Sequence, residues 1–409
     1  MDSWTEPERA LPISGRPDVL VVGGGCAGVA AAIAAARAGA DTMLLESSLR
    51  LGGLATVGLV NLLLTMDDGE GNQVVAGLCQ EFVDHMLARG RCVHPPEHQW
   101  AAEEASLVER WRHWGLIWGH PESVRYSVAY DPEAFVDVSI ELMRAAGVRL
   151  RLASTVVRAA APAGRVEAVV VESKRGREAI LPAAVVDATG DLDVAVSAGA
   201  PHEAVSIPPH LWFRAGGVTE PGPMAFRTLD KGRVLVPWGP LADRRTDPTD
   251  PDDVTETLLE CRRAAAEVFA QMKRDLPGWN EAWLDDYAGI LDITESRRLM
   301  GDHVLTREDG QRRFPDTVAR TGHWTRRGVT FDIPLRALTT AAVTNLAAAG
   351  RCISTTRYVH QATKEIPAAM ATGQAAGEAA AMAASSGVAV GAVDVESLRR
   401  RLSRAGAVV

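Results

Sequence analysis

Three glycines with the spacing GxGxxG follow an apolar run at residues 19–22, and they are Gly23, Gly25 and Gly28. The first glycine of such a motif permits a tight turn, the second lets a diphosphate approach the backbone, and the third lets a helix pack on a strand. The diphosphate then lies at a helix N-terminus, whose free N–H groups favour an anion. Glu46 follows roughly 20 residues later, where a carboxylate can accept hydrogen bonds from a ribose. The pattern predicts a dinucleotide site and disfavours NADP, because Glu46 would repel a 2′-phosphate.

A second pair of glycines, Gly52 and Gly53, comes shortly after Glu46. Adjacent glycines at the start of a loop or helix allow another close approach of the backbone to phosphate. Arg50 could add positive charge to the same anion. Taken alone, this stretch favours a surface turn with a solvated arginine.

The sequence around the first glycines predicts the elements that would position them. Strands are predicted at 19–22 and 43–45, and a helix of small residues at 27–38, ended by Gly39, lies between them. This order of strand, helix and strand is typical of a βαβ unit with a buried parallel sheet.

Further elements of the same kind recur later in the chain. A strand pair split by a turn at Gly164 is predicted in 148–172, and a strand ending in a polar turn is predicted in 181–193. A short buried strand is predicted in 345–350. Pro367 then occupies the first position of a predicted helix of small residues, whose N-terminus would stabilise the negative charge of a reduced flavin ring.

Three segments are predicted to be peripheral or structural. Trp111, Trp114 and Trp118 have helical spacing and are predicted to form one face of a core helix. Residues 244–253 are predicted to be an exposed loop. Residues 394–404 are predicted to form a terminal amphipathic helix with a solvated basic face.

Composition limits the classes of partner. The chain has 409 residues, of which 47% are hydrophobic and 23% charged, as in a globular protein with two or three folding units. It carries 43 Lys and Arg against 52 Asp and Glu, a net charge of −9. A surface of this charge does not favour nucleic acid, so we expect no nucleic-acid partner.

The cysteines, the histidines and the distribution of charge indicate where the protein resides and whether it binds a metal. The five cysteines are scattered and odd in number, which favours a reducing cytoplasm over a disulfide framework. Residues 19–36 lack charge, but their glycines and alanines argue against a membrane span, and the acidic N-terminus argues against a signal peptide. Cys92, His94 and His98 do not have metal-ligand spacing, because two prolines interrupt them. We therefore expect no membrane association and no metal, and the sequence contains neither CxxC nor GxSxG.

The order of these motifs resembles the glutathione-reductase-like superfamily of FAD-dependent oxidoreductases. More narrowly, the chain resembles the family known simply as FAD-dependent oxidoreductases, and the likeness covers most of residues 17–385. The motifs that carry it are GGGCAG at 23–28, LGG at 51–53, DATGD at 187–191, AGRCIS at 349–354 and MATGQAAG at 370–377.

The resemblance implies an α/β fold, with a Rossmann-like FAD-binding domain around a parallel central sheet and an inserted α+β substrate domain. Nine of the ten tryptophans fall in the two blocks of the predicted substrate domain, which is consistent with an apolar cavity at a domain junction. The predicted boundaries are 17–66, 125–204 and 333–385 for the FAD-binding domain, 67–124 and 205–332 for the substrate domain, and 386–409 for a helical tail.

The resemblance also implies a set of FAD contacts. The glycines at 23, 25 and 28 would hold the diphosphate, and Glu46 the adenosine ribose. Asp191 would lie near the adenine half, whereas Arg351 stands where related flavoproteins often have Asp, which leaves the ribityl contact open. Gly373, Gln374 and Ala375 would lie under the pyrimidine edge of the flavin. The full set is Gly23, Gly25, Cys26, Ala27, Gly28, Glu46, Ser47, Arg50, Gly52, Gly53, Leu54, Ala55, Thr56, Ala188, Thr189, Gly190, Asp191, Gly350, Arg351, Gly373, Gln374 and Ala375.

Catalysis on a flavin needs a substrate held against N5, a base and charge that orients the substrate. His360 lies in residues 353–367, predicted to be a loop bordering the ring, and is the candidate base. A histidine bonded to the backbone at a turn is an equally good interpretation. Lys364, where the family more often has Arg, and Tyr358 could each bind an anionic group of the substrate.

Two further arginines are candidates for the same task. Arg297 and Arg298 follow Glu295, so an ion pair within this segment is the structural alternative. Because two adjacent arginines on a helix cannot both face one acid, one is predicted to be free for a substrate carboxylate. Arg336 is a weaker candidate of the same kind.

The leading hypothesis is an FAD enzyme that exchanges two electrons with a small organic substrate, as a dehydrogenase or an oxidase. There is no second GxGxxG for NAD(P)H. An FAD monooxygenase that meets NAD(P)H and O₂ transiently is the first alternative, although the DGxxSxxR pattern of aromatic hydroxylases is missing. An NAD-binding dehydrogenase without flavin and a catalytically silent FAD-binding protein are the others. The sequence identifies neither the substrate nor the oligomeric state, and a homo-oligomer is one possible state.

Overall fold

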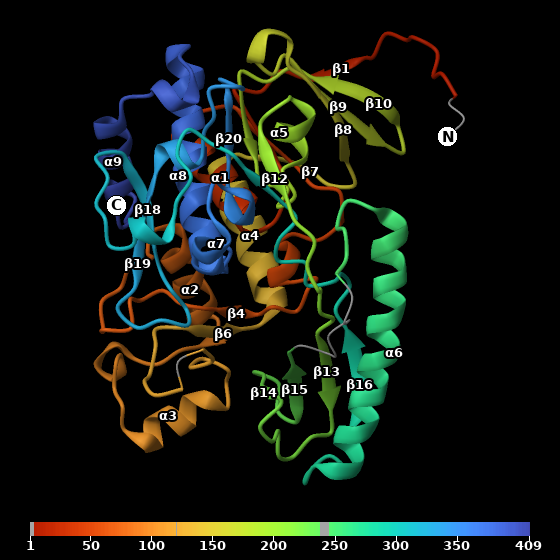
Figure 1. Ribbon diagram of the computed structural model, residues 1–409, viewed down its shortest axis with the longest axis vertical. Helices are drawn as coiled ribbons and strands as arrows, with labels where there is room; N and C mark the ends of the chain where they lie inside the picture. Colours follow the sequence, from red (N-terminus) through yellow and green to blue (C-terminus); the bar gives the residue numbers. More distant parts are fainter. Residues whose placement is uncertain (1–3, 120, 238–244) are drawn as a thin grey trace.

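The computed structural model describes residues 4–119, 121–237 and 245–409. Figure 1 shows a larger upper part around helices α1 and α8, and a lower part with α3 on one side and the long helix α6 on the other. The mixed arrangement around a parallel sheet confirms the predicted α/β class, with a Rossmann-like part and a second part.

The central sheet holds five parallel strands in the order β20-β11-β2-β3-β7. Their bounds are Val19–Val22 for β2, Thr42–Leu45 for β3, Arg149–Arg151 for β7, Ala184–Asp187 for β11 and Leu346–Ala348 for β20. Four of them, all except β7, are buried along their whole length, as the apolar runs of the sequence predict. The βαβ unit is therefore confirmed.

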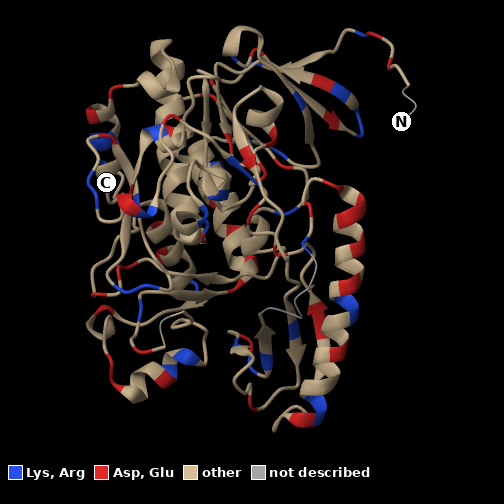
Figure 2. Ribbon diagram, viewed as in Figure 1, with Lys and Arg blue, Asp and Glu red and all other residues tan. Residues whose placement is uncertain are grey.

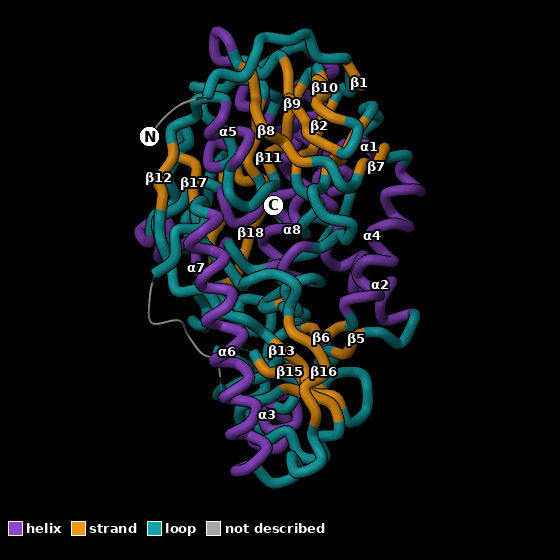
Figure 3. The backbone as a smooth tube through the Cα atoms, turned by 90° about the vertical axis from the view of Figure 1, so that its right-hand side faces the viewer, coloured by secondary structure: helices purple, strands orange, loops and turns teal. Residues whose placement is uncertain are grey.

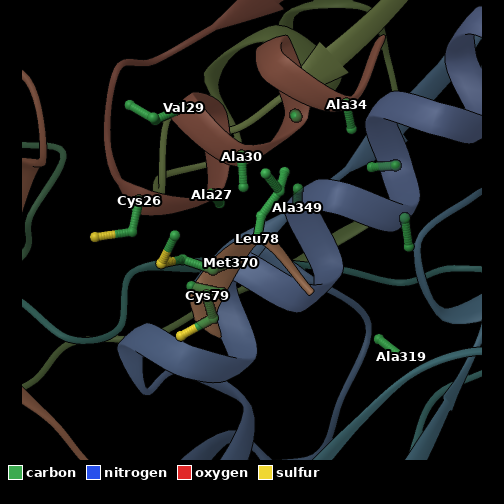
Figure 4. Close-up of a cluster of buried hydrophobic side chains, with 14 of the residues drawn as sticks. Cys26, Ala27, Val29, Ala30, Ala34, Leu78, Cys79, Ala319, Ala349 and Met370 are labelled. Carbon is green, nitrogen blue, oxygen red and sulfur yellow. The ribbon is translucent and has the colours of Figure 1, made fainter. Parts of the chain in front are cut away.

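Two helices of small residues pack on this sheet and on each other: α1 (Cys26–Arg37) and α8 (Ile366–Ser386). A Cβ on Gly373 of α8 would lie 2.1 Å from the carbonyl oxygen of Ala27 in α1, so only glycine allows this approach. Figure 4 shows Ala27 and Met370 together in the resulting cluster of buried side chains. Alanine and glycine thus bring the helix backbones together, as the sequence of α8 predicts.

A second sheet covers the upper edge of the molecule, with the order β1-β10-β9-β8. The predicted strand pair is present as antiparallel β8 (Thr155–Ala160) and β9 (Ala168–Ser173). β10 (Gly176–Ile180) extends it, and β1 (Ile13–Gly15) adds a parallel edge.

Elements from both predicted domains contribute to the core around α1 and α8. These are α2 (Leu78–Ala88), α4 (Pro132–Ala146) and the hairpin of β18 (Thr317–Gly322) and β19 (Thr330–Pro334). The terminal helix α9 (Val395–Arg404) packs on α8 and is confirmed. Because this core is shared, it does not mark where one domain ends and the other begins, and the predicted domain boundaries stay a proposal.

The lower part has its own sheet in the antiparallel order β14-β15-β13-β16. The strands are β13 (Phe213–Gly216), β14 (Phe226–Arg227), β15 (Arg233–Val236) and β16 (Trp283–Tyr287). α6 (Pro251–Asp275) runs alongside this sheet in both views (Figures 1 and 3). Figure 2 shows acidic and basic residues along α6, whereas α1 carries a single charged residue, Arg37.

Shorter elements complete the described chain. The remaining helices and strands are β4 (Leu62–Leu63), β5 (Cys92–Val93), α3 (Ala105–Arg112), β6 (Val128–Tyr130), α5 (Asp193–Ser197), β12 (His202–Ala204), β17 (Arg297–Leu299) and α7 (Arg357–Thr363). Single 3₁₀ turns lie at Gly53–Ala55, Glu97–Gln99, Pro162–Gly164, Arg307–Asp309, Leu335–Ala337, Gly350–Cys352 and Val390–Ala392.

Three local predictions are wrong or lie partly outside the described residues. Of the three tryptophans predicted on one helix face, only Trp111 is helical, because α3 ends at Arg112. The predicted loop at 244–253 gives way to α6 at Pro251, and position 244 lies outside the described residues, as does Trp238. The predicted loop at 353–367 contains α7. Within the described chain, no helix is long and apolar enough to cross a membrane.

Candidate functional site

A cavity of about 490 Å³ opens at the carboxyl ends of β2, β3 and β11. This edge of a parallel sheet is where ligands bind in doubly wound folds. Most of the predicted cofactor contacts line it, namely Gly23, Gly25, Cys26, Ala27, Glu46, Ser47, Gly52, Gly53, Leu54, Ala55, Ala188, Thr189, Gly190, Asp191, Gly350 and Arg351. The other lining residues are Val254, Leu258, Gly289, Ile290, Leu291, Ile293, Ala349, Lys364, Ile366 and Ala369.

The first glycine turn joins β2 to α1 and has three different steric requirements. Gly23 has φ +99°, and a Cβ there would lie 2.4 Å from the carbonyl oxygen of Ala188. A Cβ on Gly28 would lie 1.8 Å from the carbonyl oxygen of Gly23. A Cβ on Gly25 would meet no protein atom within 4 Å. Gly23 and Gly28 are therefore needed by the fold, whereas Gly25 leaves space in front of the N-terminus of α1.

The second glycine pair lies directly opposite the first. The N–H of Gly52 donates to the carbonyl of Gly24 over 2.8 Å, and Gly25 and Gly52 form an isolated parallel bridge. Gly52 and Gly53 have φ +99° and +55°, in the left-handed region that favours glycine. Two glycine backbones thus face the same cavity, which gives the second pair a role beyond a surface turn.

Glu46 follows β3 and holds its carboxylate at the edge of the cavity. Its Oε2 accepts from the N–H of Gly24 over 2.7 Å, and its Oε1 accepts from the N–H of Ser48 over 2.7 Å. The hydroxyl of Ser47 donates to the same Oε1 over 3.2 Å. These donors orient the carboxylate while leaving lone pairs for a further donor, as a ribose would provide.

The turn after β11 brings Asp191 against Arg351. Asp191 Oδ1 accepts from Arg351 Nη2 over 2.8 Å and from the Ser296 hydroxyl over 2.5 Å. Burial alone would raise the pKa of Asp191, but the Arg351 charge and these hydrogen bonds hold it below its usual value. A Cβ on Gly190 would lie 2.7 Å from Cζ of Arg351, so the turn needs glycine for the guanidinium to lie here. Arg351 thus forms an ion pair with Asp191. Its buried Nε has no hydrogen-bond partner in the described chain.

Lys364 reaches the cavity from the end of α7 and is only 15% exposed. Its Nζ lies 2.8 Å from Oε1 of Glu365 and 5.9 Å from the centre of the Trp324 ring. Burial opposes the charge, but Glu365 and Asp292 keep the pKa of Lys364 above its usual value. The lysine is therefore charged, and an anionic ligand must compete with Glu365 for it.

Sequence reasoning missed an apolar wall that faces the glycine loops. It is formed by Val254 and Leu258 of α6 and by Ile290, Leu291 and Ile293. Asp250 caps α6 by accepting from the N–H of Asp252 over 3.0 Å. An N-cap aspartate followed by proline and two acids is a helix-start signal, and the four-residue spacing of Val254 and Leu258 then gives one face.

Six predicted cofactor contacts do not line this cavity. Gly28 lies behind the turn, and Gly373 and Ala375 are buried in α8. Gln374 Oε1 accepts from the N–H of Leu78 over 3.0 Å, which ties α8 to α2. Arg50, paired with Glu133 over 2.7 Å, and Thr56 line a neighbouring polar cavity of about 500 Å³. Cofactor contacts at these six positions remain predictions.

His360, the predicted base, is enclosed within the protein. It lies in α7 and has no exposed surface. Burial, followed by the charges of Lys364, Arg298 and Arg351, lowers its pKa well below the usual value. The imidazole is neutral here, and it is absent from the cavity lining.

The expectation that Arg297 or Arg298 is free for a substrate carboxylate is wrong. The segment is the strand β17 and not a helix, so successive side chains point to opposite sides. Arg297 forms an ion pair with Asp193, and Arg298 lies 2.6 Å from Glu203 and 3.3 Å from Glu295. Each guanidinium therefore pairs with an acid from another part of the chain, and the Arg298–Glu295 contact is the ion pair within the segment that was the structural alternative.

The two remaining catalytic candidates also lie outside the cavity. Arg336 forms a bidentate pair with Asp316, at 2.9 and 3.1 Å. The Tyr358 ring lies 5.0 Å from the guanidinium of Arg307 and 5.7 Å from the ring of His323. Of the predicted catalytic residues, only Lys364 lines the cavity. Among the described residues, no three His, Cys, Asp or Glu side chains form a cluster that could hold a metal ion.

A family model described as FAD dependent oxidoreductase matches residues 18–222 and 210–402, which is almost the whole chain. No match is found among curated proteins. The two matched segments include both glycine loops, the turn after β11 and the α6 wall of the cavity.

Solved structures share the fold at low sequence identity. A geranylgeranyl bacteriochlorophyll reductase-like protein from Thermoplasma acidophilum is 13% identical with a TM-score of 0.55, over 94% of this chain and 90% of that one. The p-nitrophenol 4-monooxygenase of Pseudomonas putida is 15% identical with a TM-score of 0.53, over 96% and 84%. The L-proline dehydrogenase of P. horikoshii is 13% identical with a TM-score of 0.50, over 98% and 100%. These proteins are named for different reactions, so the likeness establishes the fold alone.

Proposed function

The chain belongs to the FAD-dependent oxidoreductase family, and we propose that it exchanges two electrons with a small organic substrate, as a dehydrogenase or an oxidase. Its cofactor is FAD. The observation that carries the proposal is the form of the cavity, in which two glycine backbones and Glu46 face an apolar wall from a different part of the chain. One side is suited to a dinucleotide, and the other to an organic molecule.

The residues at the cavity fit a flavin dinucleotide. Gly25 has open space at its Cβ position, and the N-terminus of α1 has no side-chain cap, so its N–H groups can face a diphosphate. Glu46 offers a carboxylate to the ribose hydroxyls, and the unpaired Nε of Arg351 offers a donor beside the turn at Asp191. These are contacts that a bound dinucleotide would complete.

FAD, when bound, supplies a ring that takes up or gives up two electrons with a proton. The protein contributes charge and exclusion of water. Lys364 and the N-terminus of α8, where Ile366 lines the cavity, place positive potential at one end. Leu258 and Leu291 exclude water from the opposite side. A carboxylate on the substrate would bind Lys364 in place of Glu365.

The proposal is tested with the holoprotein under anaerobic conditions. Bands of FAD should bleach on addition of a suitable amino acid, hydroxy acid or amine, without any nicotinamide cofactor. Rapid recovery of the bands in air would identify an oxidase, and recovery only with an added artificial electron acceptor would identify a dehydrogenase. If instead only NADH or NADPH bleaches the flavin, and does so faster with an organic substrate that is then hydroxylated, the enzyme is a monooxygenase. A flavin that no organic donor and no nicotinamide reduces would support a catalytically silent FAD-binding protein.

The anionic group proposed for the substrate has a separate test. Benzoate, an aromatic carboxylate that cannot be oxidised by a flavin, should perturb the visible spectrum of the bound FAD. Lys364→Met should remove the perturbation, whereas Glu365→Gln should strengthen benzoate binding, because it removes the competing carboxylate. Equal binding by all three proteins would place the carboxylate elsewhere.

A further inference from the structure

A second cavity of about 520 Å³ lies in the lower part of the molecule, between the end of α3 and the segment that leads into β14. Among the described residues it shares no lining residue with the cavity at the glycine loops. Its walls are mainly apolar and include two aromatic rings, three prolines and a methionine. These side chains are Ile117, Trp118, Pro121, Pro223, Met224, Ala225, Phe226 and Pro237. The volume falls in the range typical of small-molecule sites.

The aromatic walls of this cavity are held in place by their neighbours. The rings of Trp118 and Phe226 meet edge to face at 5.6 Å, and Trp118 also contacts Trp212 and Trp324 at 6.3 and 5.7 Å. Gly115 allows the Phe226 ring to lie close, because a Cβ there would be 2.7 Å from it. The Trp118 and Phe226 rings are thus preorganised for contact with another ring.

The largest of the exposed apolar side chains at this cavity is Met224, beside Pro121 and Pro223. Met224 is 60% exposed, an unusual position for a large apolar residue next to such a wall. Its flexible thioether can adapt to a ligand and makes favourable contacts with aromatic rings. A ligand seated against Trp118 would cover Met224 and remove this apolar surface from water.

The charges at the cavity restrict the chemistry of its ligand. The titratable side chains among the described lining residues are Glu109, Arg112 and His113. Glu109 accepts from Arg112 over 3.0 Å and lies 3.4 Å from His113, so both basic groups already have an acid. An anion would have to compete with Glu109, and a cation would have to displace Arg112. An uncharged ligand does neither.

We propose that this cavity is a second small-molecule site, which binds an uncharged, ring-bearing apolar molecule against Trp118 and Phe226. It is separate from the FAD cavity but not remote from it. Trp118 contacts Trp324, and the Trp324 ring lies 5.9 Å from Nζ of Lys364, which lines the FAD cavity. The rings of Trp118 and Trp324 therefore lie between the second site and Lys364 of the FAD cavity.

The test uses 2-naphthol, which is uncharged at neutral pH, and the matched anion 2-naphthoate. Titration calorimetry on the holoprotein should give one 2-naphthol per chain. In the Lys364→Met holoprotein, which lacks the carboxylate site proposed above, 2-naphthoate should bind at least fivefold more weakly than 2-naphthol. Met224→Arg places a charge at the cavity and should weaken 2-naphthol binding at least tenfold. Met300→Arg, at a 41% exposed methionine outside the cavity, is the matched control and should bind as the wild type does. Unchanged binding by Met224→Arg, or equal loss in both variants, would overturn the proposal.

A second measurement needs no variant. Mild peroxide oxidation of the wild-type holoprotein, followed by mass spectrometry, compares Met224 with Met300 in the same sample. Saturating 2-naphthol should slow oxidation of Met224 at least threefold and leave that of Met300 unchanged. Protection of neither residue, or of both to the same extent, would show that the molecule does not bind at this cavity.

Discussion

The three glycines of the first turn are equivalent in a motif but not in the structure. Gly28 has no room for a Cβ, whereas the Cβ position of Gly25 is open. A methyl group on Gly28 must shift the backbone of Gly23. A methyl group on Gly25 would project into the cavity and would leave the protein itself unstrained.

We therefore expect Gly25→Ala and Gly28→Ala to fail in different ways. Gly25→Ala should fold with unchanged thermal stability in the absence of cofactor, yet bind FAD at least tenfold more weakly, a loss of about 1.4 kcal/mol. Gly28→Ala should lose stability by about 1–3 kcal/mol or more, because the added methyl group overlaps the main chain. Circular dichroism melts of the apoproteins and fluorescence titrations with FAD separate the two effects. Full FAD affinity in Gly25→Ala would mean that the diphosphate does not approach this glycine.

The buried imidazole of His360 predicts a pH dependence of stability. Its pKa in the folded protein lies well below the usual value of about 6.5, so the unfolded chain binds a proton that the folded chain does not. Stability from this group is present above pH 6.5 and is lost as the pH falls below it. The loss amounts to about 1.4 kcal/mol between pH 7.5 and 5.5 for one proton.

His360→Gln replaces the imidazole, which can bind a proton, with a polar side chain that cannot. Urea unfolding with saturating FAD should show the free-energy difference between wild type and variant falling by about this amount from pH 7.5 to 5.5. A difference that stays constant over this range would mean that His360 is protonated in the folded protein, despite Lys364, Arg298 and Arg351 around it.

Among the elements, α6 connects the two parts of the site. Its first turns bring Val254 and Leu258 to the cavity, and the next residue, Leu259, is 63% exposed on the other side of the helix. Adjacent helical positions point about 100° apart, so neighbouring leucines offer a matched pair.

Leu258→Asp should therefore weaken FAD or substrate binding at least fivefold, because it places a carboxylate in an apolar wall. Leu259→Asp makes the same chemical change on the exposed face and should be neutral within about 0.5 kcal/mol. FAD fluorescence titrations and anaerobic flavin reduction measure both variants. Equal behaviour of the pair would show that α6 does not border the bound molecules.

The elements also explain which parts of the fold the sequence could predict. The βαβ unit is encoded locally, since buried strands and helices of small residues alternate within 30 residues, and the strands of this unit appear within one residue of their predicted bounds. α7 was missed because its seven residues are too short for a periodic pattern. β17 could not be predicted, because three residues carry too little periodicity to separate a strand from a helix.

The residues of the site can be separated in the same way, into those that the local sequence predicts and those that depend on distant parts of the chain. Residues that follow strand ends, such as Glu46 and Asp191, could be predicted because the carboxyl edge of a parallel sheet collects them. Partner choice could not be predicted. Arg297 binds Asp193, and Arg351 binds Asp191 across 160 residues, and no local pattern records such pairs. The apolar wall at Leu291 likewise depends on how the two parts of the chain meet.

At the scale of the whole molecule, the two parts have their own hydrophobic clusters and meet at the FAD cavity. One wall of that cavity comes from the parallel sheet and the other from α6 and residues 289–293. A ligand that touches both walls stabilises the contact between them. Loss of FAD should therefore lower the stability of the entire chain and not of one loop.

FAD should therefore raise the melting temperature of the apoprotein by a few degrees. At a free concentration 100 times its Kd it contributes about 2.7 kcal/mol, which a chain of this size converts into a modest shift. Riboflavin is the decisive control, because it has the ring but neither the diphosphate nor the adenosine. The N-terminus of α1 and Glu46 can hold only those missing groups, so riboflavin at the same concentration should give a much smaller shift in circular dichroism melts. An equal shift would mean that the glycine loops and Glu46 contribute little, and that recognition rests on the flavin ring alone.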